Sequence, residues 1–108
     1  MTLLIIDGMN VIGTRPDGWW RDRKGAQRRL VQELGALGEP LLIVFAGRPH
    51  DTEPPDGIEV VFAPHADDEI AARVAPGTTV VTSDRGLGER VRAAGGDVTS
   101  SKAFLSAL

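Results

Sequence analysis

An α/β fold with a mostly parallel central sheet is predicted by two patterns in this sequence of 108 residues. Short apolar runs of strand length alternate with longer stretches in which apolar residues recur every three or four positions. Strands without polar alternation are buried on both faces, which is typical of parallel sheets covered by helices. The sequence therefore predicts a three-layer sandwich of about five strands with right-handed crossovers, as a single domain over residues 1–108.

The strands and helices are assigned in order from these patterns. Five short segments are predicted as strands: Leu3–Ile6, Leu41–Phe45, Ile58–Phe62, Thr78–Thr82 and Asp97–Thr99. Three amphipathic segments are predicted as helices: Lys24–Leu37, Ala66–Val74 and Arg85–Ala94. A last helical turn capped by a serine is expected to dock Phe104, Leu105 and Leu108. The link over residues 46–57 shows no helical period, which leaves either a parallel crossover or a hairpin-like return.

Composition excludes several classes of protein. A hydrophobic content of 42% and a charged content of 25% exclude a disordered chain, and no apolar run has membrane-spanning length. The absence of cysteine excludes disulfides, thiolate zinc sites and thiol nucleophiles, so any metal must be bound by oxygen or imidazole. The start of the chain lacks the basic residues of a signal peptide, so we expect a cytoplasmic protein. The oligomeric state is left open.

Charge is unevenly distributed along the chain. The net charge of −3 argues against a protein that coats nucleic acid through bulk positive charge. Residues 15–29, however, carry six basic and two acidic side chains, a local charge of +4, and the rest of the chain carries −7. A solvated helix face is the commoner explanation of such a basic stretch.

Acidic residues stand at the predicted carboxyl ends of strands. Asp7 follows the first strand, Asp84 follows the fourth, and the cluster Asp67-Asp68-Glu69 opens the helix before the fourth strand. Each alone is a common turn or cap residue, but three carboxylates brought together repel one another unless a cation lies among them. Magnesium, which prefers oxygen ligands, suits such a site. Asn10 is expected to orient a ligating carboxylate by a hydrogen bond, or else to form a turn.

The helix register separates two of these acids. Asp67 shares a helix face with the apolar Ile70, which must pack on the sheet, so Asp67 is predicted to reach the shared crevice. Asp68 is predicted to turn away by about 100°.

Other kinds of site lack the necessary residues. Met9 stands where a haloacid-type phosphatase needs a second aspartate, and no dinucleotide-binding glycine fingerprint follows the first strand. His50 and His65 have no metal-ligand spacing and are predicted to be surface residues in loops.

Four motifs occur in a specific order and spacing: LIIDGMNVIG, HADDEIA, TSDRGL, and GGDV followed by a phenylalanine. Together they resemble the NYN-domain branch of the PIN-like nucleases, and within it the YacP-type group, over nearly the whole chain. The resemblance implies a PIN-like fold and a metal-dependent endoribonuclease, in which acidic residues hold Mg²⁺ or Mn²⁺ and water attacks the RNA phosphodiester. Carried over by position, the implied metal ligands are Asp7, Asp67 and Asp84, with Asn10 beside them.

The chain departs from the PIN-like pattern at two positions. Gly86 stands where many relatives have a further acid, and Ala46 stands where others have an acid at the end of the second strand. Two alternatives therefore remain beside hydrolysis of RNA. One is an RNA-binding module with a degenerate site, acting within a ribosome or a larger complex, and the other is a nucleotide phosphohydrolase.

The basic stretch is predicted to form the rim of the crevice, because it follows the loop after Asp7. It joins positive charge to two indole rings that can stack on unpaired bases, and one indole is expected to be buried and the other available. The residues predicted to contact RNA are Arg15, Trp20, Arg21, Arg23 and Arg85.

Overall fold

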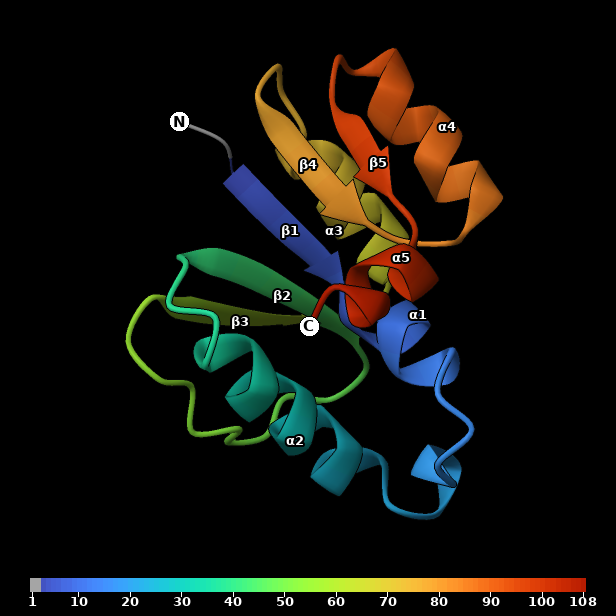
Figure 1. Ribbon diagram of the computed structural model, residues 1–108. Helices are drawn as coiled ribbons and strands as arrows, with labels where there is room; N and C mark the ends of the chain where they lie inside the picture. Colours follow the sequence, from blue (N-terminus) through green and yellow to red (C-terminus); the bar gives the residue numbers. More distant parts are fainter. Residues whose placement is uncertain (1–2) are drawn as a thin grey trace.

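Five parallel strands form one sheet in the order β3-β2-β1-β4-β5 in the computed structural model, which describes residues 3–108 (Figure 1). The strands are β1 (Leu3–Asp7), β2 (Leu41–Ala46), β3 (Ile58–Ala63), β4 (Thr78–Val81) and β5 (Asp97–Thr99). Each lies within one residue of its predicted bounds, and the predicted α/β class is confirmed. Since β3 is parallel to β2, the link between them is a crossover and not a hairpin.

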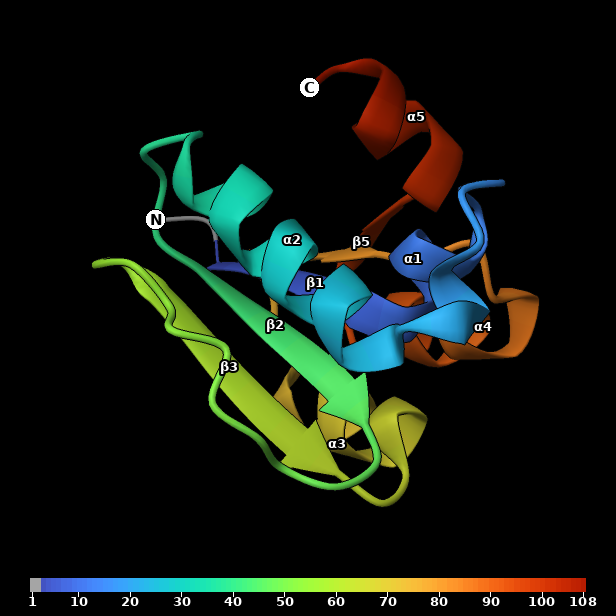
Figure 2. The same ribbon diagram turned by 90° about the horizontal axis from the view of Figure 1, so that it is seen from below.

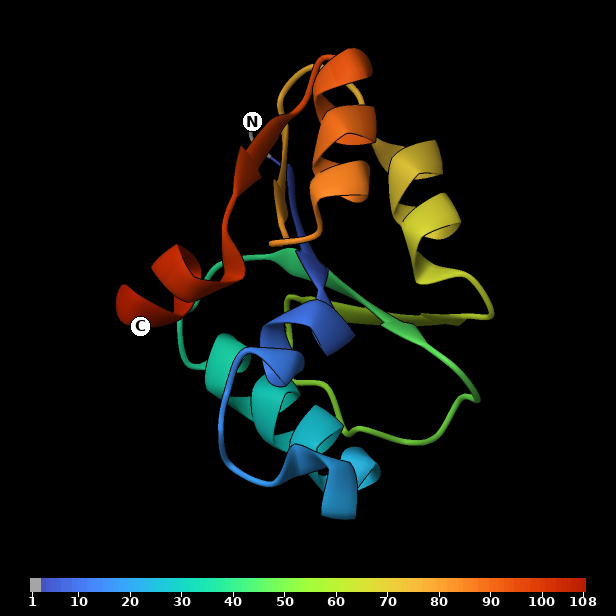
Figure 3. The same ribbon diagram turned by 90° about the vertical axis from the view of Figure 1, so that its right-hand side faces the viewer.

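Helices cover both faces of the sheet. They are α1 (Gly8–Gly13), α2 (Arg23–Gly35), α3 (Ala66–Arg73), α4 (Arg85–Ala93) and α5 (Ser101–Ser106), with a short 3₁₀ helix, η1, at Trp19–Arg21. Figures 2 and 3 show α1, α2 and α5 on one face and α3 and α4 on the other. Within residues 3–108, no helix is both long enough and apolar enough to cross a membrane.

Alternation along the strands divides the core into two layers. Ile6 of β1 packs in the cluster formed with α1 and α2, whereas its neighbour Ile5 packs in the cluster formed with α3 and α4. Successive side chains of a strand point to opposite faces, so Asp7 at the end of β1 points to the same face as Ile5. The pleat therefore directs this carboxylate toward α3 and α4.

Three local expectations were wrong. The segment after β1, expected to be a loop, contains α1 and η1, because Val11 and Ile12 find buried positions against β2 and α2. Leu37 was expected on the buried stripe of α2, but it lies beyond the end of that helix and is exposed. Leu108 is also exposed, while Phe104 and Leu105 of α5 pack on the core as expected.

The passage from β1 into α1 needs a residue without a side chain. A Cβ built on Gly8 would overlap the ring of Phe45 and lie 3.1 Å from the carbonyl oxygen of Val44. Gly13 at the other end of the same helix has open space, because a Cβ there would meet nothing within 4 Å. The two glycines of α1 therefore differ in packing while sharing one helix.

We predict that Gly8→Ala lowers the free energy of unfolding by about 1–3 kcal/mol, because the added methyl group overpacks the contact with Phe45. Gly13→Ala is the matched control and is expected to leave stability unchanged or to raise it by up to about 1 kcal/mol. Chemical unfolding of the two variants measures both effects. Equal stability of the two variants would show that α1 shifts freely against β2.

Candidate carboxylate site

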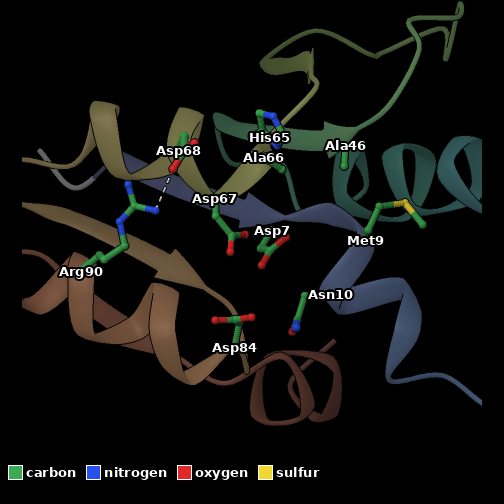
Figure 4. Close-up of a pocket in the computed structure, with 10 residues that line it drawn as sticks. All are labelled: Asp7, Met9, Asn10, Ala46, His65, Ala66, Asp67, Asp68, Asp84 and Arg90. Atoms are coloured by element: carbon green, nitrogen blue, oxygen red, sulfur yellow. Dashed lines mark hydrogen bonds and ion pairs between the residues drawn. The ribbon is translucent and has the colours of Figure 1, made fainter.

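Three predicted acids from three different elements line one pocket at the carboxyl edge of the sheet. Asp7 ends β1, Asp67 lies in the first turn of α3 and Asp84 precedes α4, and all three border a cavity of about 560 Å³. Figure 4 shows their side chains directed toward one another. The strand order reverses between β1 and β4, and open α/β sheets bind ligands at such a point.

Asp7 is the buried member of the group, with 5% of its surface exposed. Burial raises the pKa of its carboxyl group above the usual value, and the charges of Asp67 and Asp84 raise this pKa further. The hydroxyl of Thr82 opposes this rise by donating a hydrogen bond of 2.8 Å to Oδ2 of Asp7. The carboxyl group of Asp7 is therefore harder to ionise than that of an aspartate in water.

Asp84 both caps a helix and lines the pocket. Its Oδ1 accepts a hydrogen bond of 2.8 Å from the backbone amide of Leu87, which caps the N-terminus of α4. Its own amide donates to the hydroxyl of Thr82 at 3.1 Å. The ordinary explanation of this aspartate as a helix cap is therefore correct, and the same residue also lines the pocket.

Asp67 and Asp68 differ in their charged neighbours. Burial raises the pKa of Asp67, and the nearby Asp84 raises it further, whereas Arg90 lowers it. Asp68 instead forms an ion pair with Arg90, in which Nη1 lies 2.9 Å from Oδ1. As predicted, the side chain of Asp68 is directed away from Asp7 and Asp84, although Asp68 also lines the pocket (Figure 4).

Asn10 lines the pocket, but its side chain does not orient Asp7. Its Oδ1 accepts hydrogen bonds from the amide of Ser83 at 2.8 Å and from the hydroxyl of Ser101 at 2.7 Å. The hydroxyl of Ser83 accepts in turn from the amide of Ser101 at 3.0 Å. Asn10 therefore ties α1 to the loop before α4 and to the start of α5, and it positions the loop that carries Asp84.

The donor set matches a hard divalent cation in chemistry. Within residues 3–108, no group of three acidic or histidine side chains is arranged so that it could hold a metal ion by itself. Magnesium is commonly bound through one or two carboxylates, with water and substrate phosphate completing its shell. Asp7 together with Asp67 or Asp84 would supply such a partial set, and a cation there would relieve the mutual repulsion of these carboxylates.

The two indoles differ in exposure, although the one expected to be buried, Trp19, is only half-buried. Trp19 packs against the core, while Trp20 is 60% exposed and meets Trp19 edge to face. The guanidinium of Arg21 lies 5.9 Å from the centre of the Trp20 ring, within range of a cation–π contact. An exposed aromatic face with an adjacent cation is therefore present on η1.

Arginines of the predicted RNA surface lie in different settings. Arg15 forms a two-point ion pair with Glu33 of α2, at 2.6 and 2.9 Å, and it does not line the carboxylate pocket. Arg85 is almost fully exposed, with Glu89 at 3.7 Å, and it borders a pocket that also contains Asp84. Arg23 is exposed at the start of α2.

Two features of the site were missed from the sequence. Arg90 borders the carboxylate pocket, and only the helical spacing that places it one turn beyond the buried Leu87 could have suggested this. His50 was expected at the surface, but it is half-buried, bonded through Nε2 to Gln27 at 2.5 Å and packed near Phe62. His65 is exposed, as expected, and lines the pocket.

We predict that Asp7→Asn stabilises the metal-free protein at neutral pH. Because the pKa of Asp7 is raised in the folded state, the unfolding free energy of the parent protein falls as pH rises from 3.8 through the folded-state pKa. An asparagine at this position avoids the loss of unfolding free energy, which is worth about 1.4 kcal/mol per unit of pKa difference. Its amide oxygen still accepts a hydrogen bond from the hydroxyl of Thr82. Melting curves in EDTA at pH 3 and pH 7 test this, with the exposed Asp97→Asn as control. A lower melting temperature for Asp7→Asn at pH 7 would contradict it.

Comparison with known proteins supports the fold. No protein-family profile matches the chain, and no curated protein sequence matches it. Among solved structures, a single-residue mutant of Rae1 (YacP) from Bacillus subtilis is similar, with 23% identity and a TM-score of 0.79 over 99% of this chain and 74% of that one. A second structure of Rae1 (YacP) gives 22% identity and the same TM-score over 99% and 73%. The chain therefore shares the fold of Rae1 (YacP), which agrees with the YacP-type resemblance of its motifs.

Proposed function

We propose that this protein is an endoribonuclease that hydrolyses RNA phosphodiester bonds with Mg²⁺ or Mn²⁺ held by Asp7, Asp67 and Asp84. The observation that carries the proposal is that these three carboxylates line one pocket at the reversal of strand order. The motif resemblance to YacP-type nucleases and the shared fold support the same reaction class. Association with a ribosome or a larger complex stays a prediction.

The bound ion would supply Lewis-acid stabilisation of the phosphate and a water of lowered pKa. The chain's own residues supply position and charge. Thr82 fixes one oxygen of the buried Asp7, and Asn10 fixes the loop before α4. Arg90, held by Asp68 at the edge of the pocket, places positive charge near the site of a phosphate. Exposed Trp20 offers a stacking surface for an unpaired base.

A second candidate function is RNA binding with little or no cleavage. Ala46 lines the pocket without offering a ligand, and a Cβ on Gly86 would lie 3.4 Å from Oδ1 of Asp84. An acid at either position would therefore stand beside the three carboxylates, and this chain lacks both. Incubation of the pure protein with mixed RNAs, in manganese or in EDTA, separates the two functions, because only hydrolysis gives metal-dependent fragments.

We predict that Asp67→Asn abolishes metal-dependent cleavage, because it removes a carboxylate that faces Asp84. Asp68→Asn is the matched control, since it loses the same charge in the same helical turn, but its carboxylate points to Arg90 and not to Asp84. This variant should retain most activity and lose less than about 1 kcal/mol of stability. Fragment yield on denaturing gels measures both variants. Loss of cleavage in Asp68→Asn with retention in Asp67→Asn would reverse the ligand assignment.

A further inference from the structure

A second, smaller pocket lies beside the carboxylate pocket at the carboxyl end of β2. We call it the β2-side pocket, and its cavity volume is about 230 Å³. It is lined by the start of α2 and by the residues that follow β2, with Arg23, Lys24 and Arg48 as its charged members. Figure 2 shows the start of α2 beside the carboxyl end of β2. Three positive charges from two segments thus surround one hollow.

These three cations are not neutralised by the protein. Among residues 3–108, acidic side chains form ion pairs with Arg15, Arg73, Arg85 and Arg90, and none lies within 4.0 Å of a basic group of the β2-side pocket. The nearest acidic residues in sequence are otherwise engaged: Asp22 caps α2 through Gly25, and Asp51 accepts from the amide of Glu53. Like charges held together in this way favour an anionic ligand.

Hydrogen bonds connect the lining of the β2-side pocket to that of the carboxylate pocket. Gln27 is buried, and its side chain binds Nε2 of His50 at 2.5 Å and the sulfur of Met9 at 3.2 Å. Met9 lines the carboxylate pocket, and Ala46 lines both pockets. The two hollows therefore meet at Ala46.

Another basic pocket borders the carboxylates on the opposite side. This β4-side pocket has a volume of about 290 Å³, contains Arg85 and Arg92, and shares Asp84 with the carboxylate pocket. The strand order places β1, with Asp7 at its end, between β2 and β4. Strand spacing of about 4.8 Å separates the ends of β2 and β4 by about 10 Å.

We infer that single-stranded RNA crosses the carboxyl edge of the sheet from the β2-side pocket, over the carboxylates, to the β4-side pocket, with backbone phosphates bound in both basic pockets. The middle of this path, at the carboxylate pocket, rests on the proposed function. Lys24 and Arg48 are assigned as phosphate-binding residues on one side and Arg92 on the other. A single strand is favoured because its bases are free to stack, and Trp20 stands three residues before Arg23.

The test is the salt dependence of binding to a fluorescent 12-nucleotide RNA in EDTA, where metal-dependent hydrolysis is absent. For single strands, each lost phosphate contact reduces the log–log slope by about 0.7. Lys24→Ala with Arg48→Ala should therefore reduce the slope by about 1.4 and weaken binding about 25-fold at 0.1 M salt. Adding Arg92→Ala should reduce the slope by about 0.7 more.

The control is the double variant Arg29→Ala with Arg73→Ala, which loses the same charge from exposed positions that border none of the three pockets. Its slope should equal that of the parent protein. An equal loss in control and test variants would overturn the path, because binding would then follow net charge alone. An effect of Lys24 and Arg48 without an effect of Arg92 would also overturn it, since the RNA would then not continue across β4.

Failure of the path and failure of the proposed function give different results. Cleavage by the parent protein in manganese, with unchanged binding slopes in the variants, would reject the path and leave hydrolysis standing. Reduced slopes in the variants, with no cleavage by the parent protein, would establish the path and reject hydrolysis.

Discussion

The direct passage from β1 into α1 at Gly8 is the constraint on which the geometry of the site depends. The backbone there lies against an aromatic ring of β2, so α1 begins immediately after the buried Asp7. Asp7 and Asn10 are three residues apart and both reach the chain after β4, Asp7 through Thr82 and Asn10 through Ser83. The first turn of α1, which directly continues β1, therefore positions the loop before α4. That loop carries the third carboxylate.

Much of the fold could be predicted because the strands are short, apolar and clearly bounded. A parallel arrangement of β1 and β4 by itself places Asp7 and Asp84 at the same edge of the sheet. Helix α1 could not be predicted in the same way, because its six residues include two glycines and an asparagine, which are poor helix formers. Its stability comes from burial of Val11 and Ile12 in a core built from distant segments.

Charge pairing explains most of what the sequence failed to show about the site. Arg15 belongs to the basic stretch by position, but Glu33, eighteen residues further along the chain, binds it away from the carboxylates. The helix face of Asp68 does not reveal its partner Arg90, which comes from the neighbouring helix across the pocket. Such pairs depend on how α2 and α4 pack, and periodicity within one element contains no information about them. A net charge of −3 likewise conceals basic pockets on both sides of an acidic one.

The central place of β1 also affects how the protein is made. Thr82, which binds the carboxylate of Asp7, is separated from it by 75 residues, and β4 pairs with β1 along its length. At translation rates of about 5–20 residues per second, a nascent chain carries Asp7 for about 4–15 s before its partners have been added. Ser101, which Asn10 also requires, comes later still. A partly synthesised chain therefore has no assembled carboxylate pocket, and any activity of the pocket begins only after nearly all of these residues have been joined.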